Sequence, residues 1–158
     1  SITEYPLFYE EMVAYVSKKN AAFKKTYVLA DDIDLKELWL LEEGHCFRSQ
    51  IINLCELKKQ TKEKSNFEYE AGSVETLRKM VELNNGVTIL PELATLDFST
   101  KQLNMIRHFK SPAPVREVSL VTHRDYMKKK LIDVIKQQII DILPPKLALN
   151  KNKNLVKI

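Results

Sequence analysis

The stretch at residues 73–91, SVETLRKMVELNNGVTILP, decides the fold class of this chain, because a helix signal is followed directly by a strand signal. Apolar residues recur at helical spacing after Ser73, a residue type favoured at helix N-termini. The Asn-Asn-Gly turn at residues 84–86 predicts a left-handed end to the helix, and residues 87–90 predict a short buried strand that Pro91 terminates. A helix that turns directly into a buried strand is typical of α/β proteins.

Longer strand and helix signals lie on both sides of this stretch. Aromatic and β-branched residues at 7–9 and 12–16 predict either a strand pair or one long strand. Residues 115–121 alternate as a strand does, and residues 127–143 carry the apolar stripe of a long amphipathic helix. Strands alternating with helices favour a parallel, doubly wound α/β arrangement.

The segments between these elements predict only short pieces of structure. They are an acidic helix or turn at residues 30–38 with Asp31 or Asp32 as its N-cap, a buried strand at 39–41, a half-exposed strand at 67–70, and an irregular region at 92–110 with a strand at 105–106.

Two of the strands, near Val13 and Val118, are expected to join two lobes with a ligand cleft between them. The expected domains are the end of a first lobe and its crossing strand at 1–16, a second lobe at 17–115, a return crossing strand and first-lobe helix at 116–145, and a mobile tail at 146–158.

Cys46 and Cys55 are the two cysteines of the chain, and their spacing is its most informative chemical feature. Apolar residues at Phe47, Ile51 and Leu54 follow helical spacing, so the segment that holds both cysteines is expected to be a helix. Nine residues at about 1.5 Å rise place the two backbones about 13 Å apart, whereas a disulfide needs Cα atoms within about 7 Å. A bond between the cysteines would require the helix to melt, which is the pattern of a redox switch if one thiol is reactive.

Cys46 has the surroundings of a reactive thiol. It follows Gly44 and His45 at an expected helix entry and precedes Arg48, and both basic groups and helix N-termini lower the pKa of a thiol. Cys55 shares a side of the helix with aliphatic residues and is expected to be buried and inert until the helix opens. The alternative is that both are ordinary core cysteines, because free cysteine is among the most buried residue types.

The 158 residues, of which 44% are hydrophobic and 29% charged, suit one globular domain. No apolar run reaches the roughly 18 residues of a membrane span and the N-terminus carries no targeting signal, so we expect a cytoplasmic protein without membrane contact. The histidines His45, His108 and His123 share no metal-ligand spacing with the cysteines, so no metal and no cofactor are expected. The net charge of +4 is modest and no basic helix with base-reading side chains occurs, so any DNA contact requires a segment absent from this chain.

Taken together, these residues resemble the C-terminal regulatory domain of LysR-type transcription regulators, in the peroxide-sensing OxyR branch. The general features are the strand at 6–16, the helix and strand at 73–91 and the strand at 116–121. The specific feature is Gly44-His45-Cys46-x-Arg48-x-Gln50, with Cys55 nine residues beyond Cys46. The resemblance implies an α/β fold of two periplasmic-binding-protein-like lobes joined by two crossing strands. The first lobe would be incomplete, since the family's winged helix-turn-helix, linker helix and first part of the N-terminal lobe have no counterpart before Ser1.

The resemblance also implies roles for single residues. Cys46 matches the peroxidatic cysteine, which is oxidised to sulfenic acid, and Cys55 matches the resolving cysteine, which closes the disulfide. His45, Arg48 and Gln50 match the family residues around the reactive sulfur. Arg116 matches the arginine that faces the peroxide pocket, and donors such as His45 and Arg116 would hold the thiolate and polarise the O–O bond.

Alternatives remain open for some of these roles. Arg116 could instead form a salt bridge at the edge of the cleft, and His45 could be a helix-cap donor. Ser49 replaces an acidic residue that is common beside the family's arginine, so a salt bridge made there in the family is not expected here. The family's pocket threonines would come from the missing segment.

The function that the resemblance implies is a peroxide-sensing regulatory domain that is not an enzyme. Oxidation of Cys46 would remodel the lobe and the packing of a homodimer or tetramer, paired through the helix that begins at Ser73. This change would control DNA binding by an absent N-terminal domain, and cellular thiol reductants would reverse the disulfide. Three rival functions are a LysR-type domain that binds a small organic ligand in its cleft, a thiol peroxidase, and a periplasmic-type binding protein.

Overall fold

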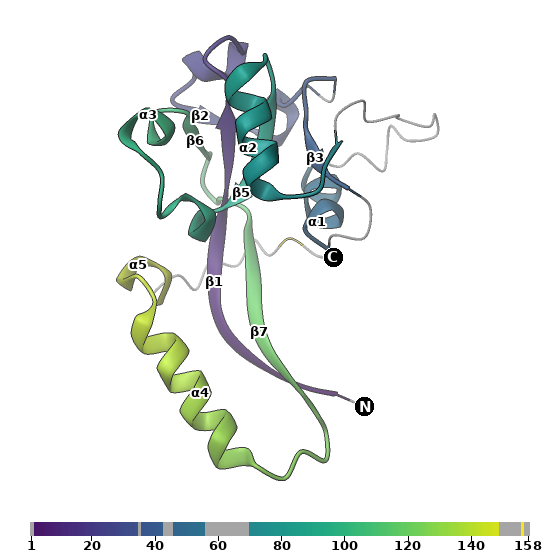
Figure 1. The fold of residues 1–158 in the computed structure, drawn as a ribbon, viewed down its shortest axis with the longest axis vertical. Coiled ribbons are helices and arrows are strands. Elements are labelled where there is room, and N and C mark those ends of the chain that lie inside the picture. Colours follow the sequence, from purple (N-terminus) through teal and green to yellow (C-terminus); the bar gives the residue numbers. More distant parts are fainter. Residues whose placement is uncertain (1, 35, 43–45, 56–69, 149–155, 157–158) are drawn as a thin grey trace.

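The computed structural model describes residues 2–34, 36–42, 46–55, 70–148 and 156. Its longest element is strand β1 (Ile2–Val16), which runs beside the antiparallel strand β7 (Val115–His123) (Figure 1). Most other elements lie around the upper half of β1, and helix α4 (Lys129–Ile142) lies along the lower half. The N-terminal segment is thus one long strand rather than a strand pair, and β1 and β7 cross together between the two halves.

The upper sheet has the strand order β2-β6-β1-β5, in which β2 spans Tyr27–Val28, β6 spans Ile106–Phe109 and β5 spans Val87–Pro91. Strand β1 is antiparallel to both neighbours, with Val13 opposite Leu90 on one side and His108 on the other, whereas β2 and β6 are parallel. The α/β class is confirmed, but the wholly parallel arrangement is wrong. Buried strands have the same apolar pattern in either direction, and β1 runs away from the lower half while β5 and β6 run toward it.

A small parallel sheet of β3 (Leu40–Leu41) and β4 (Glu70–Ala71) lies beside helix α1 (Cys46–Leu54). Helix α2 (Val74–Leu83) follows β4 and is capped by Ser73, whose hydroxyl accepts a hydrogen bond from the Thr76 N–H at 3.1 Å. Strand β5 comes next and is buried along its whole length. The predicted helix, turn and buried strand are therefore confirmed.

The turn between α2 and β5 differs from the prediction in its backbone. Asn84, which caps α2, is extended (φ −113°, ψ −169°), and Gly86 also lies outside the left-handed region, so the predicted left-handed ending is wrong at these two positions. A Cβ atom on Gly86 would instead collide with the indole ring of the buried Trp39. Close packing of the turn against Trp39 therefore requires the glycine.

Short helical turns occur where the sequence predicts little structure. They are η1 (Ala21–Lys24), η2 (Ala30–Asp32), η4 (Glu92–Thr95) and α3 (Thr100–Leu103). An aspartate does not cap η2, because its N-cap is Leu29, whose N–H donates to the Asp32 carboxylate at 2.8 Å. Ser99 caps helix α3, and its N–H donates to the Gln102 side chain at 3.0 Å. Elements of three or four residues are too short to show a helical apolar period.

Two predicted strands have different bounds from those expected. The strand predicted at residues 105–106 is β6, which begins at Ile106 and continues to Phe109. The strand predicted at 67–70 is described only at Glu70, the first residue of β4, and its other residues lie outside the described part of the chain.

Helix α4 contacts β1 and buries Ile132, while several of its other apolar side chains are exposed. The chain then forms the short helix α5 (Pro145–Ala148), where Leu147 is buried. The Val156 N–H donates to the Val115 carbonyl at 2.8 Å, so the predicted mobile tail is packed against the rest of the chain at these points. In the part of the chain that the structure describes, no helix is long and apolar enough to span a membrane.

Candidate functional site

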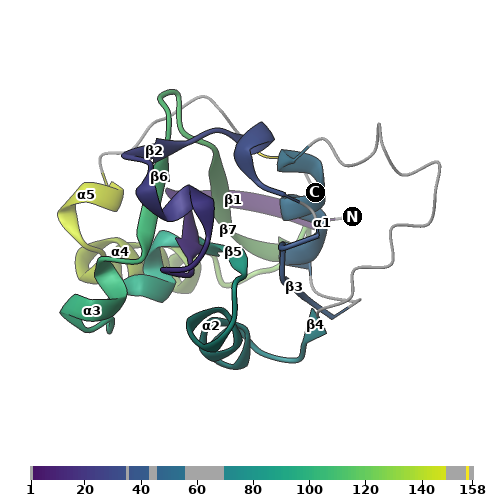
Figure 2. The same cartoon turned by 90° about the horizontal axis from the view of Figure 1, so that it is seen from above.

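Helix α1, which begins at Cys46, packs beside β3 and near the ribbon of β1 and β7 (Figure 2). Phe47 and Ile51 lie one turn apart and are 6% and 0% exposed, so they anchor the helix to the core. The Cys55 N–H donates to the Ile51 carbonyl at 3.1 Å, and helical hydrogen bonding therefore continues to Cys55. The predicted helix is confirmed from Cys46 to Leu54, while residues 56–57 of the predicted stretch lie outside the described residues.

The helix separates the backbones of the two cysteines. Nine positions at the helical rise place them about 13 Å apart, roughly twice the Cα separation that a disulfide tolerates. Cys55 is a free thiol. The side chain of Cys46 lies outside the described part of the structure, so the distance between the two sulfurs and the Cys46–Cys55 disulfide stay predictions. What the backbone shows is that such a bond requires α1 to open.

Cys55 has the environment of an unreactive thiol. Its side chain is half-buried and packs against the hydrophobic core. Burial, and to a lesser extent the negative charge of Asp31, raise the pKa of Cys55 to about 12. A thiol with this pKa is almost entirely protonated at neutral pH and is a poor nucleophile. Exposure by opening of α1 would bring its pKa back toward the ordinary value and activate it.

Arg48 ties α1 to the small sheet of β3 and β4. Its Nη1 donates to the Leu41 carbonyl at 2.8 Å and lies 2.6 Å from the Glu70 carboxylate, with the Arg48 side chain 11% exposed. A charged hydrogen bond in such a shielded place is stronger than a surface ion pair. These contacts hold α1 in position, while the predicted role of Arg48 around the Cys46 sulfur stays a prediction.

Gln50 has a buried hydrogen-bond acceptor for which the described residues offer no partner. Its side chain is 6% exposed, and its Oε1 has no hydrogen bond with any described residue. Because Gln50 lies four positions after Cys46, the two residues occupy the same face of α1. A buried polar atom without a partner costs about 1–3 kcal/mol, which a ligand or a modified sulfur that donates to it would recover.

Arg116 makes the salt bridge that the sequence left open as an alternative, while its role in a peroxide pocket stays a prediction. Its Nε and Nη2 both lie 2.6 Å from Oε1 of Glu10, its partner across the β1–β7 ribbon. Its guanidinium carbon lies 5.3 Å from the centre of the Phe47 ring, which is a cation–π contact with α1. Arg116 therefore connects the crossing strands to the residue that follows Cys46.

Sequence reasoning missed Glu10 as part of this site. Its carboxylate is 0% exposed, and it shares one side of β1 with the buried Phe8 and Met12. A charged residue between apolar residues at alternate positions of a strand is the signal that could have identified it, because buried carboxylates are nearly always paired.

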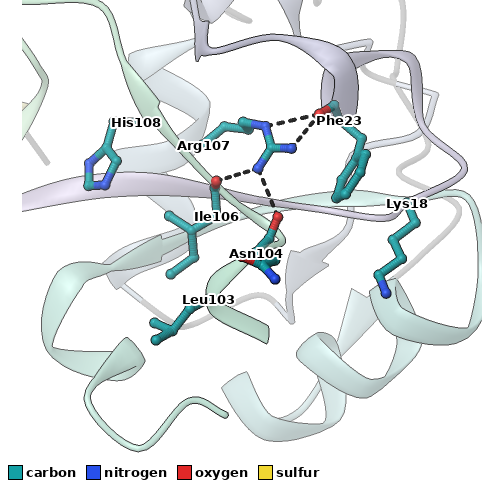
Figure 3. A pocket seen from close by; sticks show the side chains of 7 residues that line it. All are labelled: Lys18, Phe23, Leu103, Asn104, Ile106, Arg107 and His108. Atoms are coloured by element: carbon teal, nitrogen blue, oxygen red, sulfur yellow. Dashed lines mark hydrogen bonds between the residues drawn. The ribbon is translucent and has the colours of Figure 1, made fainter. Parts of the chain in front are cut away.

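The remaining predicted site residue, His45, lies outside the described residues, so its role stays a prediction. His108 lines a separate open hollow of about 850 Å³ whose walls are Lys18, Phe23, Leu103, Asn104, Ile106, Arg107 and His108 (Figure 3). Arg107 there donates to the Asn104 carbonyl at 2.9 Å and to that of Phe23, so its charge serves backbone acceptors. Among the residues that the structure describes, no group of histidine, cysteine and acidic side chains could hold a metal ion.

Comparison with solved structures finds the same fold in OxyR proteins. The reduced OxyR of Porphyromonas gingivalis superposes with a TM-score of 0.83 at 31% identity, covering 98% of this chain and 70% of that one. The reduced regulatory domain of OxyR from Pseudomonas aeruginosa has a TM-score of 0.69 at 28% identity, covering 87% of this chain and 65% of that one.

The curated relatives are transcription regulators. The hydrogen peroxide-inducible genes activator of Haemophilus influenzae is 36% identical over 118 residues, which is 75% of this chain and 38% of the relative. The regulator EstR of Acinetobacter baylyi is also 36% identical, over 72% of this chain and 36% of its own length. The chain thus spans less than two fifths of these relatives. Residues 1–141 match the family model described as the LysR substrate binding domain, and the chain therefore belongs to this family, within which its fold matches OxyR regulatory domains.

Proposed function

We propose that this chain is the peroxide-sensing part of a transcription regulator, in which Cys46 reacts with hydrogen peroxide and then forms a disulfide with Cys55. The observation that carries the proposal is helix α1, which begins at one cysteine and ends immediately before the other. The helix keeps the two cysteines apart, and a disulfide between them could form only if the helix were lost. The relatives named as hydrogen peroxide-inducible activators support peroxide as the signal.

The first chemical step is attack of the Cys46 thiolate on one oxygen of hydrogen peroxide. An S–O bond forms, the O–O bond breaks, and hydroxide leaves and takes up a proton to become water, so sulfur is oxidised and peroxide reduced. Donors that stabilise the leaving hydroxide accelerate this step, and Arg116 is the donor proposed for it, together with His45. In this proposal Oε1 of Gln50, which has no hydrogen-bond partner among the described residues, accepts a hydrogen bond from peroxide or from the sulfenic acid O–H.

The second step requires α1 to open. The Cys55 thiolate attacks the Cys46 sulfenic sulfur, the S–S bond forms, the S–O bond breaks, and hydroxide leaves. Inside the folded helix, the pKa of Cys55, raised to about 12, opposes this step. Opening therefore brings the two sulfurs together and also makes Cys55 nucleophilic. A cellular thiolate that attacks the disulfide frees one cysteine and forms a mixed disulfide with the other. A second thiolate then attacks the mixed disulfide, leaves as the oxidised cellular disulfide and frees the remaining cysteine, so that the helix can form again.

Loss of α1 gives a route from this chemistry to subunit packing. Opening the helix releases Arg48 from Glu70 in β4, and β4 is followed within three residues by the first residue of α2. Helix α2, or the surface around it, is the proposed pairing surface of a homodimer or tetramer. A domain outside this chain would bind DNA, and its spacing would follow the pairing.

A second candidate is a domain that binds a small organic ligand in the cleft. It is favoured by the match to a family model described as a substrate binding domain, and by Arg116, whose guanidinium could bind a carboxylate. Thermal unfolding with a panel of small acids would show an upward shift for this candidate and none for the peroxide sensor.

The experiment that tests the proposal is intact-mass analysis after treatment with peroxide. The parent chain should lose two hydrogens, Cys46→Ser should be unchanged, and Cys55→Ser should gain one oxygen and then two or three as Cys46 is overoxidised. Reduction by a thiol should reverse only the parent product. A Cys46→Ser variant that still loses two hydrogens, or a parent chain that does not react, would overturn the proposal.

A further inference from the structure

Glu10 is a carboxylate without solvent contact, placed on β1 shortly before this strand enters the upper sheet. Its Oε1 receives both the Nε and the Nη2 of Arg116 at 2.6 Å. Its Oε2 accepts the Leu93 N–H, from the 3-10 turn η4, at 3.0 Å. A buried carboxylate is stable only with such partners, and here Arg116 holds one of its oxygens while the Leu93 N–H holds the other.

The guanidinium of Arg116 therefore has two contacts, one with Glu10 and one with Phe47. Glu10 binds one edge, and the ring of Phe47, in the first turn of α1, lies 5.3 Å from the guanidinium carbon. An arginine has five N–H donors in a rigid plane, and two of its nitrogens, Nε and Nη2, face Glu10. The donors of Nη1, on the other edge of the plane, are directed away from Glu10.

We propose that Glu10 is a positioning residue for the reaction of Cys46 with peroxide. Its carboxylate fixes Arg116 beside the start of α1. The Nη1 donors of the guanidinium, which face away from Glu10, can then stabilise the negative charge that develops on the departing hydroxide. Glu10 itself does not touch the peroxide. The inference rests on the proposed function, because it assigns how the Arg116 donor of that function is held.

The physical reason is the flexibility of the arginine side chain. Without a fixed partner, the guanidinium would sample many rotamers, and a donor misplaced by about 1 Å can cost about 10²-fold in rate. A buried carboxylate on the neighbouring strand removes that freedom before peroxide arrives. The alternative is that Glu10 only joins η4 to the ribbon through Leu93 and has no effect through Arg116.

A double-mutant cycle on the rate of peroxide oxidation separates these two roles. In the full-length protein, Glu10→Gln should slow oxidation of Cys46 about tenfold or more when Arg116 is present, as expected for a misplaced donor. In the Arg116→Ala background the same change should alter the rate by less than about twofold, since Glu10 then has nothing to position. Equal slowing in both backgrounds would overturn the inference.

Glu11→Gln is the matched control. Glu11 is the next residue of β1, and its carboxylate lies 3.8 Å from His108 instead of near Arg116. We expect its oxidation rate to stay within about twofold of the parent, as for an independent site. If Glu10→Gln does not fold, Glu10→Asp takes its place in the cycle. Aspartate keeps the negative charge, but its side chain is one methylene shorter, so the carboxylate lies farther from Arg116. Its slowing should likewise disappear in the Arg116→Ala background.

A peroxide-independent measurement distinguishes failure of this inference from failure of the proposed function. The Arg116 Nε–H proton should give a sharp, slowly exchanging NMR signal in the parent and in Glu11→Gln, and the signal should be broadened or lost in Glu10→Gln. An unchanged signal in Glu10→Gln would overturn the positioning role. A parent chain that does not react with peroxide but shows the expected signals would overturn the proposed function alone.

Discussion

Helices α1 and α2 have nearly the same length and belong to the same lobe, yet different interactions hold them. The sequence of α2 supports it locally, because Ser73 caps it and Glu75 pairs with Lys79 one turn later at 3.2 Å. Helix α1 has no acidic residue in its first turn and no basic residue in its last. It depends on the burial of Ile51 and on the contacts of Arg48 with β3 and β4.

The difference determines which helix can be exchanged for another structure. Neither helix is long enough to persist by itself in water. Helix α2 adds a local cap and ion pair to its burial, whereas α1 relies on the burial of Ile51 and the contacts of Arg48 with other elements. Elements that open locally are those whose stability comes from few contacts that can be lost together. Helix α1 therefore has the properties of a switch, and α2 those of a stable element that can transmit the change.

The largest expected effect comes from shortening the buried side chain that anchors each helix to the core. Ile51 in α1 and Leu77 in α2 are both 0% exposed, so Ile51→Ala and Leu77→Ala should each lower the free energy of unfolding by about 2–5 kcal/mol. Only Ile51→Ala should also speed alkylation of Cys55, because it favours opening of α1. Urea unfolding and timed alkylation would measure both. Equal alkylation rates in the two variants would contradict the view that α1 opens separately.

A smaller effect is expected from the arginine of each helix. Arg48→Ala removes hydrogen bonds of a shielded charge and should cost about 1.5–3 kcal/mol. Arg78→Ala in α2 removes ion pairs of 3.6 Å and 3.9 Å to Glu82 and Glu75, together with a cation–π contact with Phe98, and should cost less, about 0–1 kcal/mol. Thermal unfolding of both variants would rank them. If Arg78→Ala costs more, local sequence does not account for the stability of α2.

Coupling between the two helices should change subunit association by about 1–3 kcal/mol. The exposed polar face of α2 and its 76% exposed Leu83 are the surface concerned. Sedimentation of the full-length protein should give different association constants for the reduced and oxidised forms, and Leu83→Glu should weaken association. If the association constants and the crosslinks are the same in the two redox forms, oxidation of the thiols does not change subunit packing, and the proposed link to DNA binding is wrong.

The smallest effect concerns pH. Since folding raises the pKa of Cys55 from the ordinary 9.0 to about 12, the folded state holds this proton more tightly than the open state does. The resulting stability is complete below about pH 9 and is lost as the pH rises toward 12, by at most about 1.4 kcal/mol per pH unit. Urea unfolding between about pH 8 and 10, in which the loss begins, should show the loss in the parent and not in Cys55→Ala. The same slope in both would assign it to another group.

The sequence by itself determined the features that depend on near neighbours along the chain. The apolar period and Ser73 predicted α2, the short apolar run predicted β5, and the nine-residue spacing predicted that a helix separates Cys46 from Cys55. The same local pattern predicted that Cys55 is buried and unreactive, which its raised pKa supports. Helical and strand periods are local properties, so a single sequence is enough to show them.

The tertiary structure alone decided the features that depend on which distant residues meet. The apolar pattern could not give the direction of β1 against β5 and β6, and nothing near Gly86 in the sequence indicates that Trp39 packs over it. Glu10 and Arg116 are 106 residues apart, and only the register of β1 on β7 makes them partners. Partner choice is determined by strand pairing and by the free energy of burying charge in pairs, and these act on the folded chain as a whole rather than on any one segment of it.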